Sequence, residues 1–182
     1  MACDLTKGRK EPCKDVVGGL KAVYFVDFGD LGTVSKTDDE ITDMTGTFSA
    51  YKYELKGGSS FEQAITSSRE NGTTFFDQTL SLSLKKLTKE DNKELKLLAY
   101  GRPHVAIEDY NGNVFLMGLE HGSDVNGGTI VTGAAMADLS GYTLTLNGQE
   151  LEPANFVSGA TSADPFAGMG SATVTIVQGT ND

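Results

Sequence analysis

The sequence has no tryptophan, only two cysteines and only two histidines. Glycan-binding β modules use exposed aromatic rings, so the lack of tryptophan and the scarcity of aromatics in the expected loops argue against that class. The two cysteines and the two distant histidines are too few for a structural metal site. No G-x-S-x-G, H-E-x-x-H, P-loop or C-x-x-C motif is present. We therefore expect no enzyme activity, cofactor or metal.

Cys3 and Cys13 lie ten residues apart. They are compatible with a disulfide that closes a small N-terminal loop, or with two free thiols in a reducing compartment. The sequence shows no apolar h-region near its start, so we expect no signal peptide and favour the free thiols.

Basic residues are also scarce, since 15 Lys and Arg stand against 25 Asp and Glu, for a formal net charge of -10. This balance disfavours a protein that holds nucleic acid by neutralising phosphates. No apolar run approaches the roughly 20 residues of a membrane helix. We expect a protein made in the cytosol, with no membrane partner and with one domain carrying terminal arms.

The chain is rich in glycine, with 22 residues, which suits a turn-rich β protein. Its clearest pattern is a strict alternation after Gly72, which predicts a long strand with one buried and one polar face. The apolar positions are Phe76, Leu80, Leu82 and Leu84, and the polar ones are Asp77, Thr79, Ser81, Ser83 and Lys85.

Residues 60–70 predict the partner of this strand. Asn71–Gly72 is a strong hairpin signal and joins the two into an antiparallel ribbon. On the partner, the apolar face carries Phe61 and Ile65, and the polar face carries Glu62, Thr66 and Ser68.

A helix is predicted directly after the ribbon. Thr88 is its expected N-cap, with acids in the first turn, and Gly101 and Pro103 end it. Leu95 and Leu98 lie three residues apart and are expected to pack the helix onto the sheet.

The remaining patterns predict strands at 20–28, 48–55, 104–110, 114–117 and 139–146, and a weaker one at 129–136. Asn111–Gly112 and Asn147–Gly148 are predicted turns. Residues 29–47 are predicted to be a long loop, and residues 151–170 an extended arm. A β-type run at 172–179 must pair with another strand. About eight strands and one helix predict two packed antiparallel sheets, a β-sandwich or open barrel with a flanking helix.

Few side chains suggest chemistry. We interpret His104 as a capped or solvated histidine rather than a base, and we discount a pairing of His121 with Asp124 because no nucleophile is indicated. Glu108 and Asp109 are neighbours on a strand and point to opposite faces, so we expect hairpin-end solvation. The acidic run 38–43 lacks the ligand spacing of a calcium loop, which favours a solvated charged loop.

A two-faced ribbon, two arms and a long loop are typical of a protein that assembles, because ribbons that join edge to edge abolish their own bare edges. The alternative is a monomeric β-sandwich with free ends. Four stretches resemble the major tail tube proteins of long-tailed bacteriophages: SFEQAITSSRENGTTFFDQTLSLSLKKL, TKEDNKELKLLAYGRP, VAIEDYNGNVFLMG and GYTLTLNGQELEPA. The opening 30 residues are similar to virion proteins of phages that infect Bacteroidetes-type hosts.

The resemblance spans residues 1–157 and rests on the order of the predicted elements and on the general character of the sequence, rather than on a short diagnostic motif. It implies an N-terminal arm at 1–19, a tube-like β domain at 20–157 and a C-terminal extension with a short strand at 158–182. It also implies stacked hexameric rings whose lumen barrel is completed by oligomerisation. On this reading the lumen-facing candidates are Glu62, Thr66, Ser68, Thr79, Ser81 and Ser83. Lys85 departs from this set and is expected near one ring rim or outside the lumen.

The resemblance further implies a virion location, assembly in the host cytoplasm, and transient, non-specific passage of DNA. The implied partners are further copies of the chain, a tape-measure protein, a tail terminator, baseplate proteins and, in contractile tails, a sheath. Three alternatives stay open: a neck or tail-completion ring protein, the tube of a phage-derived injection system, and a glycan-binding module.

Overall fold

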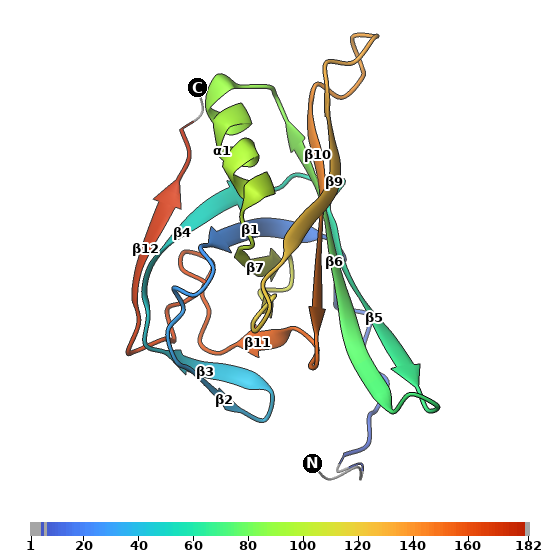
Figure 1. The fold of residues 1–182 in the computed structure, drawn as a ribbon, viewed down its shortest axis with the longest axis vertical. Coiled ribbons are helices and arrows are strands. Elements are labelled where there is room, and N and C mark those ends of the chain that lie inside the picture. Colours follow the sequence, from blue (N-terminus) through green and yellow to red (C-terminus); the bar gives the residue numbers. More distant parts are fainter. Residues whose placement is uncertain (1–4, 6, 181–182) are drawn as a thin grey trace.

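In a computed structural model, the chain forms two packed sheets and one helix over the described residues, residue 5 and residues 7–180 (Figure 1). The smaller sheet has four strands in the order β5 (Ser60–Ser68), β6 (Thr73–Lys85), β10 (Gly141–Glu150) and β9 (Asp124–Val131). The larger has eight, in the order β12 (Thr173–Gln178), β4 (Thr47–Glu54), β1 (Leu20–Val26), β7 (His104–Asp109), β8 (Val114–Met117), β11 (Asn155–Val157), β3 (Glu40–Met44) and β2 (Val34–Thr37). The two packed sheets and the single helix confirm the predicted fold class. One copy contains no closed barrel over this range, and completion of a lumen barrel by oligomerisation stays a prediction.

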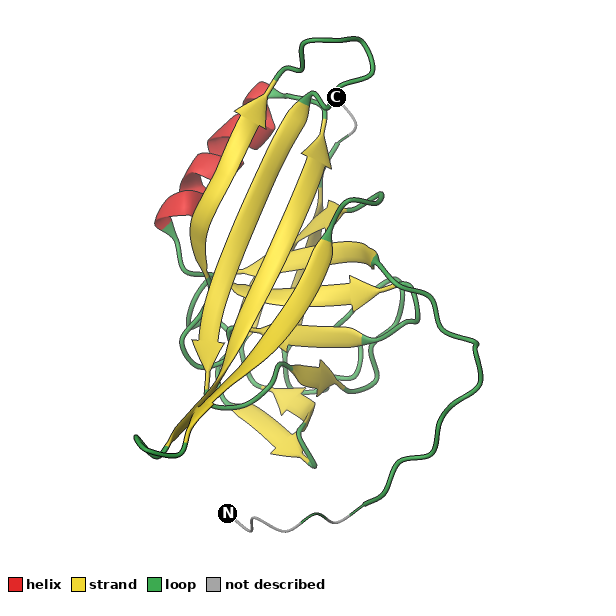
Figure 2. Ribbon diagram, turned by 90° about the vertical axis from the view of Figure 1, so that its right-hand side faces the viewer, coloured by secondary structure: helices red, strands yellow, loops and turns green. Residues whose placement is uncertain are grey.

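The small sheet is antiparallel throughout and contains the predicted ribbon. β5 and β6 pair from Ser60 opposite Ser81 to Ser68 opposite Thr73, and Gly72 at their turn has a φ of 63°. Figure 2 shows the four long strands of this sheet in front of the shorter strands of the large sheet, which cross behind them at a steep angle. Such a crossing is the orthogonal mode of sheet packing.

Two apolar clusters hold the layers together. One lies between the sheets and joins Leu80, Leu82 and Leu146 of the small sheet to residues of the large sheet such as Val105. The other covers the far face of the large sheet and includes Phe166 from the C-terminal segment. The centre of the large sheet is therefore buried on both faces, whereas the small sheet is buried on one.

The helix α1 (Lys89–Tyr100) begins and ends as predicted. The Oγ1 of Thr88 accepts a hydrogen bond from the backbone N–H of Asp91 at 3.0 Å, and the N–H of Gly101 donates to the carbonyls of Leu97 and Leu98. Leu95 is buried, and Leu98 packs against the cluster between the sheets. The helix thus attaches to the outside of the sheet pair through the predicted leucines.

The predicted loop at 29–47 is wrong, because residues 34–44 form the hairpin β2–β3. Asp38 and Asp39 make its two-residue turn with φ values of 51° and 63°. Both angles are positive, as a type I′ turn requires, and Asp tolerates them less readily than Gly. The acidic run is therefore the tip and second strand of a hairpin.

The turn predicted at Asn147–Gly148 is also wrong, since both residues lie inside β10. A Cβ on Gly148 would meet the carbonyl oxygen of Gly122 at 3.1 Å, so this glycine permits a close backbone approach. The sheet consequently gains a longer β10 than the alternation alone indicated.

The segment 151–170 is not an extended arm. It contributes β11 to the large sheet and buries Phe166 and Met169 in its core. The following β-type run forms β12, which pairs with β4 as the pairing argument required. This pairing and that of β11 with β3 are parallel, so the large sheet is mixed rather than antiparallel.

The described part of the N-terminal arm contains no strand before β1 and is exposed. Its base is held by Asn111, which accepts a hydrogen bond from the N–H of Val17 and donates one to its carbonyl. Cys13 is exposed and has no disulfide partner among the described residues. Cys3 lies outside the described residues, so the choice between a Cys3–Cys13 disulfide and two free thiols stays a prediction.

Candidate functional site: the polar face of the small sheet

The small sheet presents one continuous face away from the core, which we call the polar face. The registers of the four strands place together all six residues that the sequence nominated for a lumen. The face consists of Ser60, Glu62, Ala64, Thr66 and Ser68 of β5, Thr73, Phe75, Asp77, Thr79, Ser81, Ser83 and Lys85 of β6, Gly141, Thr143, Thr145, Asn147 and Gln149 of β10, and Asp124, Gly127, Thr129 and Val131 of β9.

Side chains of the polar face bond to one another across strands. The amide of Asn147 donates to Asp77 Oδ1 at 2.6 Å and to Thr79 Oγ1 at 3.3 Å. The hydroxyls of Thr129 and Thr143 lie 2.6 Å apart. These lateral bonds satisfy polar groups within the sheet and make a surface of short, hydrogen-bonded side chains.

The charge of the polar face is negative. It carries the acids Glu62, Asp77 and Asp124, and Lys85 is the only Lys or Arg in the four strands. Lys85 lies at the end of β6, where its Nζ donates to the carbonyl of Lys56 at 2.9 Å. A polyanion is not held electrostatically by such a surface.

The opposite face of the ribbon packs against the core along only part of its length. Leu80 and Leu82 are buried, Phe61 and Leu84 pack at the edge of the inter-sheet cluster, and Phe76 is half-buried. Ile65 is 70% exposed, so the expectation that it packs in the core is wrong. The cause is visible in Figure 1, where the end of the β5–β6 hairpin extends beyond the large sheet.

Two strand edges of the small sheet are bare. β5 and β9 are its outermost strands, and neither pairs with a further strand within the described part of the chain, although the helix α1 lies beside β9. On β9, Ile130 is 63% exposed although its register with Tyr142 places it on the core-facing side. Bare edges with exposed apolar side chains are sites where another chain can pair.

Sequence reasoning missed the polar residues that β9 and β10 add to this face. Thr143 and Thr145 already alternated with Tyr142 and Leu144, but the apparent turn at Asn147 hid the continuation to Gln149. The continued alternation through Asn147 and Gln149 was the available signal.

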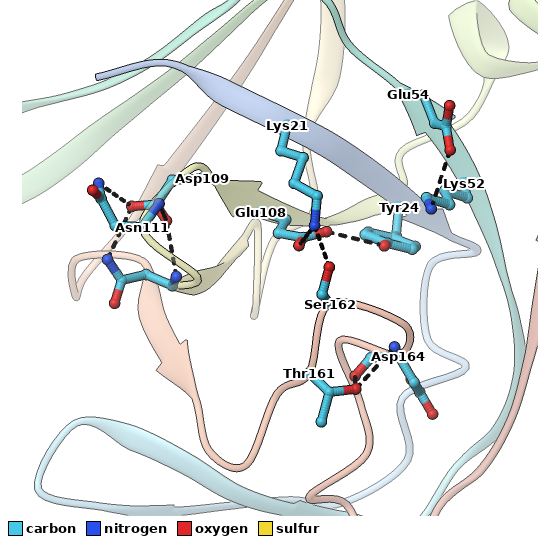
Figure 3. A network of polar contacts seen from close by, with 11 residues as sticks. Lys21, Tyr24, Lys52, Glu54, Glu108, Asp109, Asn111, Thr161, Ser162 and Asp164 are labelled. Carbon is cyan, nitrogen blue, oxygen red and sulfur yellow. Dashed lines mark hydrogen bonds and ion pairs between the residues drawn. The ribbon is translucent and has the colours of Figure 1, made fainter. Parts of the chain in front are cut away.

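The large sheet holds an ion pair between the half-exposed Lys21 and the buried Glu108, away from the polar face (Figure 3). The Nζ of Lys21 lies 2.5 Å from Glu108 Oε1 and also bonds the hydroxyl of Ser162, and the hydroxyl of Tyr24 donates to Glu108 Oε2 at 3.2 Å. Glu108 is buried, so its predicted solvation is wrong. Burial, aided by Glu108, raises the pKa of Tyr24 and keeps the phenol a donor. This network ties β1 and β7 to the C-terminal segment.

Asp109 organises the β7–β8 turn. Its carboxylate accepts hydrogen bonds from the backbone N–H groups and side-chain amides of Asn111 and Asn113, at 2.8 to 3.2 Å. Partial burial acts to raise the pKa of Asp109, but these donors outweigh it and lower that pKa. The role is that of a turn cap.

His104 is buried rather than solvated. Its Nδ1 lies 2.6 Å from the carbonyl of Gly118 and its Nε2 accepts from the N–H of Gly29 at 3.1 Å, which defines a neutral ring protonated on Nδ1. The ring stacks on Phe28 at a centroid distance of 5.0 Å. Burial lowers the pKa of His104, so the neutral form is the stable one.

His121 contacts Glu150 rather than Asp124. Its Nδ1 lies 3.0 Å from Glu150 Oε2, and Glu150 Oε1 accepts the backbone N–H groups of Glu120 and His121. These residues line a pocket of about 330 Å³ whose lining contains no Ser, Thr or Cys nucleophile. Glu150 therefore holds the loop at Glu120 and His121 in place.

Across residue 5 and residues 7–180, no group of three or more His, Cys, Asp or Glu side chains is placed to hold a metal ion. No helix of the described chain is both long enough and apolar enough to cross a membrane.

Comparison with known proteins finds no matching family model, no matching curated protein and no matching solved structure.

Proposed function

We propose that this protein is the tail tube subunit of a long-tailed bacteriophage, forming stacked hexameric rings whose hollow lumen conducts DNA into the host. The observation that carries the proposal is the small sheet, which combines one apolar face, one neutral-to-acidic face and two bare edges. The unpaired backbone groups at such edges are a template for pairing with further copies.

Strand direction supports closure into a ring. The order β5-β6-β10-β9 alternates in direction at each step, so β9 and β5 run antiparallel to each other. Copies placed head to tail continue the alternation, and a heterologous contact of this type closes into a ring when the rotation between neighbouring copies divides a full turn evenly. Six copies of the four strands would build a barrel of 24 strands, larger than the 16–18-stranded porins that already enclose an aqueous channel.

The polar face suits the lining of such a channel. Its hydroxyls bond laterally, its fixed charges are mainly acidic, and its single lysine lies at a strand end. DNA is bound by counterion release when cations contact phosphates, so a lumen with few cations lets the genome slide. Glu62, Thr66, Ser68, Thr79, Ser81 and Ser83 are the proposed lumen residues.

The large sheet, the helix α1 and the arm at 5–19 would lie outside the barrel. The proposal accordingly includes contacts between stacked rings, and partners in a tape-measure protein, a tail terminator, a baseplate and, in a contractile tail, a sheath. The location follows as the virion tail, and the role is structural rather than enzymatic.

Electron microscopy of the purified protein at high concentration, with mass measurement in solution, tests the proposal. The expected result is hollow filaments or six-fold rings with a mass near six times 19.3 kDa. Double-stranded DNA added to the assembled rings should not bind to them at physiological salt. A monomer that stays unassembled with its tape-measure partner, or tight DNA binding by the rings, would overturn it.

A further inference from the structure

The edge strands of the small sheet carry two exposed isoleucines that the fold of one copy leaves uncovered. Ile65 on β5 and Ile130 on β9 are 70% and 63% exposed, and both lie on the core-facing side of the sheet. We propose that β9 of one copy pairs antiparallel with β5 of the next, with Ile130 opposite Phe61 and Val125 opposite Ile65. This inference rests on the ring of the proposed function and adds the register in which β9 and β5 pair between neighbouring copies.

The two faces of the sheet restrict this register. A slip by one residue would turn Ile130 toward the polar face of the next copy. Only shifts by two residues keep the apolar side chains of both strands on the core-facing side of the sheet. The bulge in β9 between its contacts to Thr145 and Leu146 adds one unpaired residue, Asn126. With the bulge counted, all of β9 fits within β5 in two registers, with Val131 opposite either Ser60 or Glu62.

Side-chain matching distinguishes these two registers. With Val131 opposite Ser60, Ile130 meets Phe61, which is only partly buried, and Ile65 meets Val125. With Val131 opposite Glu62, Ile130 would face Gln63 and Ile65 would face Gly128. Apolar cross-strand pairs each contribute roughly 0.2–1 kcal/mol, which favours the first register.

The geometry of a closed barrel is compatible with the same register. Within one copy, Ile130 is level with Leu84 through Tyr142, and Phe61 is level with Leu80. Joining Ile130 to Phe61 therefore displaces the next copy by the four residues between Leu84 and Leu80, for every four strands. One residue of stagger per strand is the ratio of an eight-stranded barrel with a shear of eight, whose strands tilt by about 36°.

The alternative register gives a barrel with a steeper tilt. Joining Ile130 to Gln63, which is level with Gln78, displaces the next copy by the six residues between Leu84 and Gln78. With about 3.3 Å per residue and about 4.8 Å between strands, the tilt becomes about 46°. The same spacings give a tilt of about 35° for the first register, so the two tilts lie at the two limits of the usual range of about 35–45°. The choice between the registers therefore rests on side-chain matching.

Cysteine cross-linking of assembled rings tests the register. In a background with Cys3→Ser and Cys13→Ser, the variant Glu62→Cys/Thr129→Cys places the two thiols directly opposite each other across the junction. Opposite residues have Cα atoms about 4.5–5.5 Å apart, within the range of a disulfide. The matched control, Ala64→Cys/Thr129→Cys, makes a diagonal pair about 7–8 Å apart in this register but an opposite pair in the alternative. All three positions lie on the polar face, so none disturbs the core.

Mild oxidation of rings followed by non-reducing electrophoresis should give a ladder up to the hexamer for Glu62→Cys/Thr129→Cys and monomer for the control. A ladder from the control alone would overturn the register while leaving the ring intact. Rings in micrographs with no ladder from either variant would overturn the β9–β5 junction. A parent protein that stays monomeric would overturn the ring itself, and with it the proposed function.

Discussion

The two sheets of this protein differ in how much of themselves they bury. The centre of the large sheet is covered on both faces, by the small sheet on one side and by the C-terminal segment with Phe166 and Met169 on the other. The small sheet covers one face only and leaves the polar face and two edges exposed. The large sheet thus supplies most of the stabilising burial, whereas the small sheet keeps surfaces available for other molecules.

Under the proposed function, this difference separates the residues that act on folding from the residues that act on assembly. A substitution on the core side of either sheet acts on the free energy of unfolding, because it removes or charges buried apolar surface. A substitution on the polar face or at an edge of the small sheet should leave one copy folded and change only what copies do together.

The largest effect is expected for Leu82→Asp. Leu82 is buried between the sheets, and an unpaired carboxylate there should cost on the order of 4–5 kcal/mol, close to the whole stability of the least stable domains. The matched control is Ser81→Asp, one residue along the same strand on the polar face. It should change the free energy of unfolding, measured by urea denaturation, by about 0.5 kcal/mol. Unfolding of the Ser81→Asp subunit would contradict the two-faced description.

A slightly smaller loss is expected for Phe166→Ala. The ring of Phe166 packs edge-on against Phe48 at 5.2 Å and is buried on the far face of the large sheet. Its removal should cost roughly 3–5 kcal/mol, read as a lower denaturation midpoint. Removal of residues 1–16, which are exposed where described, is the comparison and should leave that midpoint nearly unchanged. Equal shifts of the denaturation midpoint in the two variants would show that the packing of the C-terminal segment on the large sheet does not stabilise the fold.

Local rules predicted the small sheet well because its pairing is largely local. The β5–β6 ribbon, its Asn71–Gly72 turn and the capped helix after Thr88 all follow from alternation, turn chemistry and capping within a few residues. The six polar candidates share one face for the same reason: alternation fixes the side of each residue.

The same rules failed where the deciding contact is distant. Asn147–Gly148 reads as a turn, but its neighbours in β6 and the backbone of Gly122 hold it extended. Asp38 and Asp39 make a tight turn without the glycine that signals one. Phe166 is buried by strands more than a hundred residues earlier in the chain, and Ile65 is exposed because its hairpin extends past the core. None of these facts is encoded in a short window of sequence.

A pH-dependent effect of intermediate size is expected from His104. Burial holds the pKa of the folded-state imidazole below its ordinary value, so below about pH 6.5 the unfolded chain binds the proton more readily. The free energy of unfolding should therefore fall as the pH drops below about 6.5, by up to about 1.4 kcal/mol per pH unit, until the folded-state pKa is reached. His104→Gln should remove this part of the slope, and His121→Gln, on an exposed side chain, should retain it. Equal slopes in all three proteins between pH 5 and 7 would contradict the neutral buried ring.

The smallest effect on folding, with a large effect on assembly, is expected for Ile130→Lys. Ile130 is 63% exposed at the bare edge of β9, so one copy should lose only about 0.5 kcal/mol of stability. In a ring the lysine would lie opposite Phe61 of the next copy, where burying its charge without a partner opposes pairing. Sedimentation should then show folded monomers in place of rings. Met136→Lys, on an exposed loop between β9 and β10, is the matched control and should assemble normally. Rings of Ile130→Lys in normal yield would mean that the β9 edge takes no part in assembly. The assignment of assembly to the edges of the small sheet would then be wrong for β9.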